Sequence, residues 1–171
     1  MSEFDEKKQN TIVVEPELQL FDELSRLGWT VATAESCTGG GIASRLTKHA
    51  GSSAYLKGSV VAYCNEVKHR VLQVDANILQ KKSAVCKEVV EQMAVNVRRL
   101  METDLGISVS GVAGPGGGTK EIPVGTIWMA AAGANRVEAK CLHLQKNREE
   151  NIKTTIDEAI FFAKEFARKE K

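Results

Sequence analysis

The chain has 171 residues, enough for one domain with a hydrophobic core. Hydrophobic residues make up 43% of it and charged residues 26%, a composition that excludes global disorder. The formal net charge of +1 argues against a general nucleic-acid-binding protein, whose surface is strongly basic, so we expect no nucleic-acid partner.

The chain starts with MSEFDEKKQN, which is charged and lacks the apolar segment of a signal peptide. No apolar run approaches the ~20 residues that cross a bilayer. We therefore expect a cytoplasmic protein with reduced thiols and no membrane partner. The four cysteines and three histidines have neither CxxC nor HxxxH spacing, so the sequence predicts no metal site.

Predicted helices and strands alternate along the chain. Residues 1–14 are expected to form a flexible N-terminal segment, and a single domain is expected over 15–171. A helix is predicted to begin near Pro16, because proline suits a first helical turn, and to end at Gly28. The following elements are a strand (29–36), a glycine turn and helix (38–50), a strand (57–64), a short helix capped by Asn65 (65–74), a long helix (87–103), three strands (105–114, 123–133, 136–145) and a C-terminal helix (149–168).

This alternation predicts an α/β fold, a three-layer α/β/α sandwich with a mixed, mostly parallel sheet of about five strands. The first strands are joined through helices, which favours parallel pairing. The strands at 123–133 and 136–145 are joined by a few residues, so we expect that pair to be antiparallel. In open α/β sheets, ligands bind beyond the carboxyl ends of the strands.

The first candidate segment is 34–41, which contains Ser36 between a predicted strand and a predicted helix. Backbone amides at such a junction can bind an anion or a developing oxyanion. The alternative is a structural turn in which Thr38 caps the helix. Cys37 is an alternative nucleophile, but no histidine is near it in sequence, and a small buried residue is the favoured interpretation.

Two further segments follow predicted strands. In the segment 62–68, Tyr63 and Lys68 flank a strand-to-helix junction; a lysine in a dry pocket loses proton affinity and can act as a base for a serine. The alternative is a solvent-exposed lysine. The segment 108–119 has five glycines within eight residues, and its amides can form an anion-binding concavity. The alternative there is a flexible surface loop.

Several ordered motifs together resemble the CinA C-terminal family, over about residues 17–167. They are TAESCTGG (33–40), AGSSAYLKGSVVAYCNEVK (50–68), SAV (83–85), SVSGVAGPGGG (108–118) and PVGTIWMA (123–130). The characterised activity of this family is nicotinamide mononucleotide deamidase. The resemblance implies a single CinA C-terminal-like domain in a stand-alone form.

The resemblance also implies a metal-independent serine amidohydrolase without a cofactor. Its small-molecule partner would be a pyridine mononucleotide, converted to nicotinate mononucleotide and ammonia, and members are typically homo-oligomers. Ser36 would be the nucleophile, and Lys68 and Tyr63 would activate it and shuttle the proton. Arg148 is a candidate counter-charge for the phosphate. The expected substrate-binding residues are Glu35, Thr38, Gly39, Gly40, Asn65, Ser110, Gly111, Ala113, Gly114, Gly117 and Arg148.

The chain departs from the family pattern at four positions near these motifs. Cys64 replaces a serine, Gly116 replaces a residue that is usually acidic, Cys86 stands where a serine often precedes the long helix, and Ile152 stands where active members typically have a second arginine. These departures motivate two other hypotheses. One is a nucleotide-binding or regulatory protein with weak or no catalysis, and the other is an amidohydrolase of another small amide.

Overall fold

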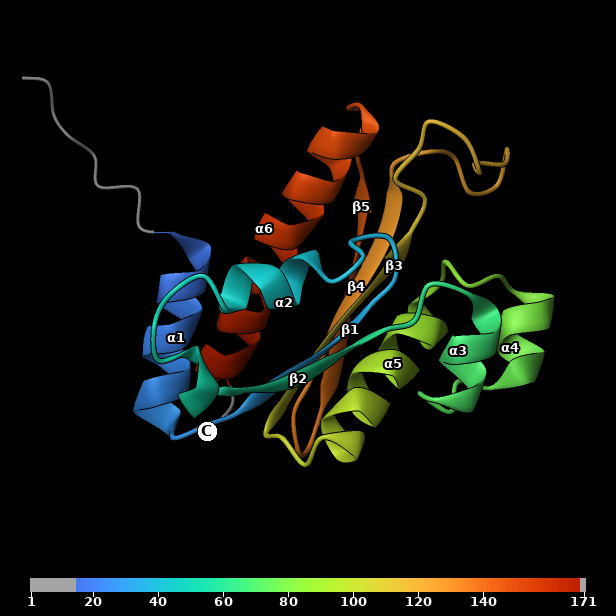
Figure 1. The fold of residues 1–171 in the computed structure, drawn as a ribbon. Coiled ribbons are helices and arrows are strands. Elements are labelled where there is room, and N and C mark those ends of the chain that lie inside the picture. Colours follow the sequence, from blue (N-terminus) through green and yellow to red (C-terminus); the bar gives the residue numbers. More distant parts are fainter. Residues whose placement is uncertain (1–14, 170–171) are drawn as a thin grey trace, which may run out of the picture.

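A five-stranded mixed sheet forms the centre of the molecule (Figure 1). The computed structural model describes residues 15–169, so the flexible segment expected over 1–14 lies outside the described residues. The sheet order is β2-β1-β3-β4-β5. β1 pairs in parallel with β2 and β3, whereas β3–β4 and β4–β5 are antiparallel, which confirms the predicted mixed sheet. The strands are β1 (Val31–Glu35), β2 (Leu56–Val61), β3 (Leu105–Gly111), β4 (Thr126–Ala132) and β5 (Val137–His143).

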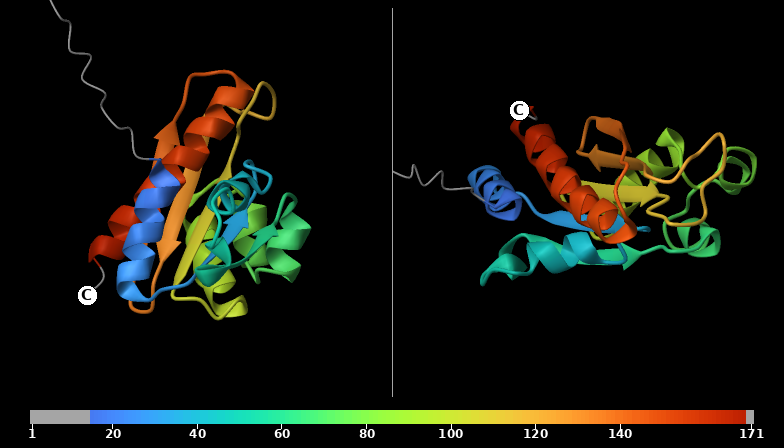
Figure 2. Two further views of the ribbon diagram at one scale, coloured as in Figure 1. Left: turned by 60° about the vertical axis from the view of Figure 1, so that its left-hand side comes forward. Right: turned by 90° about the horizontal axis from the view of Figure 1, so that it is seen from above.

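Helices cover both faces of the sheet, which confirms the three-layer α/β/α prediction (Figure 2). One face carries α1 (Pro16–Leu27), α2 (Gly41–Leu46) and α6 (Arg148–Lys169). The other face carries α5 (Lys87–Leu100), beside which lie α3 (Asn65–Arg70) and α4 (Ala76–Lys81). A short 3₁₀ helix (Ser52–Ala54) precedes β2. Gly28 ends α1 in the left-handed conformation, which confirms the predicted end of this helix.

Successive strand residues point to opposite faces, so each strand contributes to both cores. On β1, Val31 packs with α1 and α6, whereas Ala32 and Ala34 pack toward α5. The alanines allow α5 to lie close to the sheet. The two also lie close together at Gly106 on β3, where an added Cβ would lie 2.1 Å from the carbonyl oxygen of Ala94.

The region after β2 differs from the sequence prediction. The helix predicted over 65–74 ends at Arg70, and α4 was not predicted. The α4 helix starts after Asp75, whose carboxylate accepts a hydrogen bond of 2.7 Å from the amide of Asn77. The predicted cap at Asn65 is wrong: Cys64 occupies the cap position and makes no capping hydrogen bond through its side chain.

The three parallel strands bring the three candidate segments together. β1, β2 and β3 run in the same direction, so their carboxyl ends lie at one edge of the sheet. The segments 36–40, 62–68 and 111–118 follow these ends directly. Over residues 15–169, no helix has both the length and the apolar character needed to cross a bilayer.

Candidate active site

Ser36 and Lys68 are in direct contact inside the protein. Ser36 follows the last residue of β1, and its amide donates to the carbonyl of Val109 at 3.1 Å, which holds it in line with the sheet. The Lys68 Nζ donates to Ser36 Oγ at 2.9 Å and to the carbonyl of Ala62 at 2.7 Å. Lys68 is 2% exposed, so the alternative of a solvent-exposed lysine is wrong.

The environment of Lys68 favours the neutral amine. Burial lowers the pKa of Lys68 below its usual value, and the weaker influence of the Cys37 and Cys64 thiols acts in the opposite direction. Across residues 15–169, no carboxylate forms an ion pair with Lys68. A buried amine without a counter-charge, beside a hydroxyl, has the properties of a general base for that hydroxyl.

Cys37 does not have the properties of a nucleophile. Its side chain is buried, and burial raises the pKa of the Cys37 thiol to about 12. The thiol therefore stays protonated near neutral pH, and the thiolate is the reactive form. This agrees with the interpretation of Cys37 as a small buried residue.

Glu35 holds the turn that carries Ser36. Its carboxylate is fully buried and accepts from Thr38 Oγ1 at 2.6 Å and from the amides of Ile42 and Ala43 at 3.0 and 2.8 Å. Thr33 Oγ1 donates to the same carboxylate at 3.1 Å. Glu35 therefore caps α2, and the alternative of Thr38 as the helix cap is wrong. Glu35 and Thr38 were expected to bind the substrate, but in the structure their side chains bond to each other and position the turn.

The turn 36–40 leaves backbone donors beside the nucleophile. Gly39 and Gly40 have left-handed φ values of 60° and 96°, which allow the sharp reversal between β1 and α2. Within the part of the chain that the structure describes, no backbone carbonyl accepts from the amides of Cys37, Thr38 or Gly40. Unpartnered amides next to Ser36 are suited to stabilise an oxyanion.

A cavity of about 220 Å³ opens beside Ser36. Arg148, at the start of α6, donates to the Gly114 carbonyl at 2.8 Å and to the Tyr63 hydroxyl at 3.2 Å. Tyr63 is 61% exposed and lies at the rim, with its hydroxyl on Arg148 rather than on Ser36 or Lys68. The cavity is lined by Ser36, Cys37, Tyr63, Gly111, Val112, Ala113, Gly116, Gly117 and Arg148.

Two expected substrate-binding residues lie elsewhere. The Ser110 hydroxyl is buried and donates to the Ala84 carbonyl at 2.8 Å, so it fastens β3 to the chain before α5. Asn65 is exposed and lines a different hollow between α3 and α4, together with Glu66 and His69.

Two residues of α6 support the cavity wall, and no sequence signal identified either role. Asn151 is fully buried and donates to the Ala113 carbonyl at 3.0 Å, which holds the glycine-rich loop against the helix. Ile152 packs in an apolar cluster with Cys37 and Ala113. The departure at position 152 therefore gives the protein an apolar contact beneath the nucleophile turn.

The side chains with polar groups at this cavity are those of Ser36, Cys37, Tyr63 and Arg148, which include no carboxylate or imidazole ligand for a metal. The three metal-ligating side chains that lie together among residues 15–169 are Glu15, Glu17 and His49. They share no residue with the Ser36 cavity.

Comparison with known proteins identifies relatives over nearly the whole chain. The family model described as the CinA C-terminal domain matches residues 14–167. A CinA-like protein of Cytophaga hutchinsonii is 51% identical over 132 residues, which are 77% of this chain and 32% of that protein. A putative competence-damage inducible protein of Halothermothrix orenii is 44% identical over 86% of this chain and 37% of its own length. The chain thus spans about a third of the length of these curated relatives.

Solved structures match over nearly their full lengths. A CinA superfamily protein of Klebsiella pneumoniae 700603 is 32% identical with a TM-score of 0.86, covering 90% of this chain and 96% of that one. A competence/damage inducible protein of Agrobacterium tumefaciens is 33% identical with a TM-score of 0.83, covering 95% of this chain and 96% of the other.

Proposed function

The chain belongs to the CinA C-terminal domain family, and we propose that it is an amidohydrolase that converts nicotinamide mononucleotide to nicotinate mononucleotide and ammonia. The observation that carries this proposal is the buried contact of 2.9 Å between Lys68 Nζ and Ser36 Oγ. The substrate is the one that the motif resemblance implies. The paired hydroxyl and amine support a reaction that uses a serine nucleophile.

In the proposed first step, Ser36 Oγ attacks the amide carbon while neutral Lys68 accepts the hydroxyl proton. The carbonyl of Ala62, 2.7 Å from Nζ, accepts an N–H of the amine and holds it beside Ser36. Lys68 then returns the proton to the departing nitrogen, which leaves as ammonia. Water attacks the ester on Ser36, with Lys68 again taking a proton, and releases the carboxylic acid.

Two groups would hold the charges of the substrate. The amides of Cys37, Thr38 and Gly40, from which no backbone carbonyl within residues 15–169 accepts a hydrogen bond, would stabilise the tetrahedral oxyanion. Arg148 lines the cavity, and no carboxylate within residues 15–169 forms an ion pair with it, so its charge is available to a phosphate.

The binding-only hypothesis rests on the changed cavity positions. Gly116 offers no side chain at the cavity, and Ile152 is packed among apolar side chains. The acidic side chain and the second arginine that the family pattern has at these two positions are therefore missing. The nucleophile and the base are retained, which favours catalysis. Thermal shift with nicotinamide mononucleotide, combined with an activity assay, separates the two: stabilisation without turnover would favour a binding protein.

The test is ammonia release by the purified chain from nicotinamide mononucleotide, nicotinamide riboside, nicotinamide and glutamine, with the Ser36→Ala variant as the blank. We expect the mononucleotide to react fastest, because it alone among the four presents both the ring amide and a phosphate for Arg148. Turnover of another amide, with none for the mononucleotide, would replace the proposed substrate. Wild-type rates equal to the blank for all four would end the proposal.

A further inference from the structure

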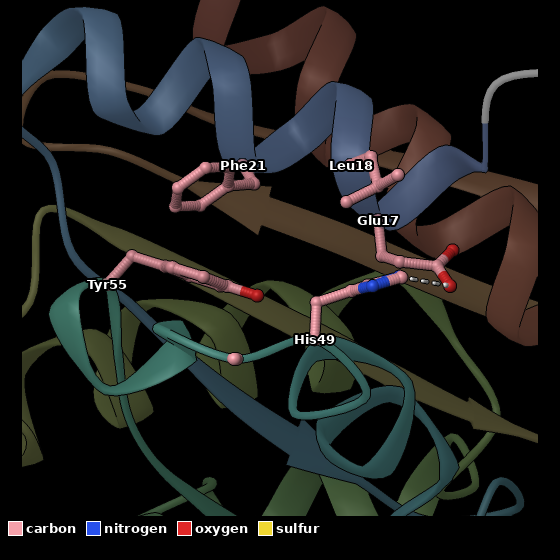
Figure 3. Close-up of a pocket in the computed structure, with 6 residues that line it drawn as sticks. Glu17, Leu18, Phe21, His49 and Tyr55 are labelled. Carbon is pink, nitrogen blue, oxygen red and sulfur yellow. Dashed lines mark ion pairs between the residues drawn. The ribbon is translucent and has the colours of Figure 1, made fainter.

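A second cluster of ionisable side chains lies between the start of α1 and the turn after α2, and Figure 3 shows two of its members, Glu17 and His49. Glu15 and Glu17 come from the start of α1, and His49 comes from the turn. One ligand atom from each residue lies within 4.8 Å of the other two. Figure 3 shows the His49 ring directed at the Glu17 carboxylate.

Glu17 is the unusual member of this cluster. It is 1% exposed, and its Oε1 is buried without a hydrogen-bond partner. The nearest cationic groups, Lys48 Nζ and His49 Nε2, are each 3.7 Å from this oxygen, beyond hydrogen-bond length. A buried carboxylate oxygen without a hydrogen bond is rare and costly, and it marks a position that a ligand would satisfy.

The charge balance around Glu17 favours a cation. Glu15, Glu17 and Asp157 contribute three negative charges, and Arg45 and Lys48 contribute two positive charges, so these five side chains together carry −1. Arg45 pairs with Asp157 at 2.8 Å, whereas its contact with Glu17 Oε2 is longer, at 3.5 Å. Arg45 therefore compensates the charge of Glu17 less than that of Asp157.

We propose that Glu15, Glu17 and His49 bind a divalent transition-metal ion of the zinc class. An imidazole nitrogen with carboxylate oxygens is a donor set that suits zinc. Two donors at about 2.0–2.2 Å from a tetrahedral ion lie roughly 3.3–3.6 Å apart. His49 Nε2 is 3.0 Å from Glu15 Oε2 and 3.7 Å from Glu17 Oε1, so both donor pairs that include His49 have nearly this spacing.

Lys48 competes with the ion in this proposal. Its Nζ is 2.6 Å from Glu15 Oε1, and its side chain is 49% exposed. A half-exposed lysine leaves such a pair at little cost in free energy, so the ion displaces it. The bound ion would join α1 to the turn after α2. It would lie next to a cavity of about 70 Å³, whose wall includes Phe21 and Tyr55.

This proposal replaces the sequence expectation of no metal site and is independent of the proposed deamidase activity. That expectation rested on cysteine and histidine spacing, which does not detect two glutamates and one histidine brought together by tertiary structure.

The test measures Zn²⁺ and Co²⁺ binding to the EDTA-treated chain by calorimetry and thermal shift. We expect Tm to rise by about 5–10 °C at a Zn²⁺ concentration 100 times Kd. Lys48→Ala should lower Kd by about threefold or more. His49→Ala and Glu17→Gln should each raise Kd at least about tenfold. Bound Co²⁺ should show visible bands without thiolate charge transfer.

His143→Ala is the matched control. His143 Nε2 lies 3.8 Å from Cys141 Sγ, and this histidine–cysteine pair is the alternative place where zinc could bind. This control should bind zinc like the wild type. The proposal is overturned if neither the wild type nor Lys48→Ala binds zinc. It is equally overturned if binding is lost in His143→Ala and kept in His49→Ala, or if Mg²⁺ binds and Zn²⁺ and Co²⁺ do not.

Discussion

At the scale of single residues, the chemistry depends on keeping one amine uncharged. Lys68 is buried, and both of its hydrogen bonds are to neutral oxygens, those of Ser36 and Ala62. Neither oxygen compensates an ammonium charge as a carboxylate would. In the proposed mechanism, the lowered pKa of Lys68 would allow the neutral amine to take the proton of the Ser36 hydroxyl.

The pH dependence of kcat/KM is the first prediction. Protonated Lys68 cannot accept the Ser36 proton, so kcat/KM should rise with pH through the pKa of Lys68, which burial holds below the ordinary value of 10.5. The measurement is deamidation over roughly pH 6–10. The residual rate of Lys68→Met should not follow this rise. An identical profile in that variant would assign the ionisation to another group.

The sequence placed Ser36 and Lys68 at neighbouring strand-to-helix junctions, and the structure brings them into contact. Their roles as nucleophile and base stay a prediction, and the sequence did not predict what surrounds them. The hydrogen-bond partners of Glu35 and Tyr63 could not be predicted, because these bonds join different elements. Glu35 accepts from amides of α2, and the Tyr63 hydroxyl accepts from Arg148. The family resemblance suggested substrate contact for Glu35, whereas its burial and its hydrogen bonds give it a positioning role.

At the scale of elements, the turn between β1 and α2 depends on one carboxylate. The second prediction is that Glu35→Gln lowers the free energy of unfolding by about 2–4 kcal/mol. A glutamine amide presents an NH₂ group to at least one of the donors that Glu35 now accepts from, including the amides of Ile42 and Ala43. Because the same turn carries Ser36, kcat should fall at least about tenfold.

Denaturant unfolding and deamidase kinetics check this prediction, with Glu66→Gln as the control. Glu66 is exposed, and its side chain pairs with Arg70 at the surface, so its loss should change the unfolding free energy by less than about 0.5 kcal/mol. Equal stability of the two variants would contradict the capping role of Glu35.

The contact between α5 and the sheet gives the third prediction. Gly106→Ala places a Cβ 2.1 Å from the Ala94 carbonyl oxygen, so α5 must move away from β3. We expect a loss of about 1–3 kcal/mol by denaturant unfolding. Gly116→Ala is the matched control, because its Cβ would meet no atom within 4 Å. Similar losses in both variants would contradict the steric explanation.

Periodicity predicted the longer elements well and the short ones poorly. The apolar face of α5 and the buried runs of β3 and β4 are regular over many residues, and each was predicted near its observed position. The α4 helix has six residues, and one of them, Leu79, is buried. A helix this short has no detectable apolar stripe and is fixed by Asp75 and by packing on α5.

At the scale of the whole molecule, the parallel arrangement of β1, β2 and β3 assembles the site. It places the ends of three strands side by side, so that segments up to about 80 residues apart meet at one cavity. This was predictable, because helical crossovers favour parallel strands and ligands bind at their carboxyl ends. The homo-oligomer expected from the family resemblance stays a prediction, to be checked by light scattering.

Global stability gives the fourth prediction. Lys68→Met should raise the free energy of unfolding at neutral pH by about 0.5–2 kcal/mol, because a buried polar group is replaced by an apolar side chain of similar length. The lowered pKa means that the unfolded chain binds more protons between that pKa and 10.5, so wild-type stability rises with pH in this window. The advantage of the variant should therefore shrink toward pH 10.5. A difference in unfolding free energy between variant and wild type that does not change with pH would contradict the lowered pKa of Lys68.

The most direct test of the account compares kcat/KM for ammonia release from nicotinamide mononucleotide among the wild type, Ser36→Ala and Lys68→Met. We predict that each variant loses at least about 10³-fold while remaining folded, with the Tm of Lys68→Met at or above that of the wild type. A folded variant of either kind that retains activity within about tenfold of the wild type would contradict the pairing of Ser36 and Lys68 as nucleophile and base.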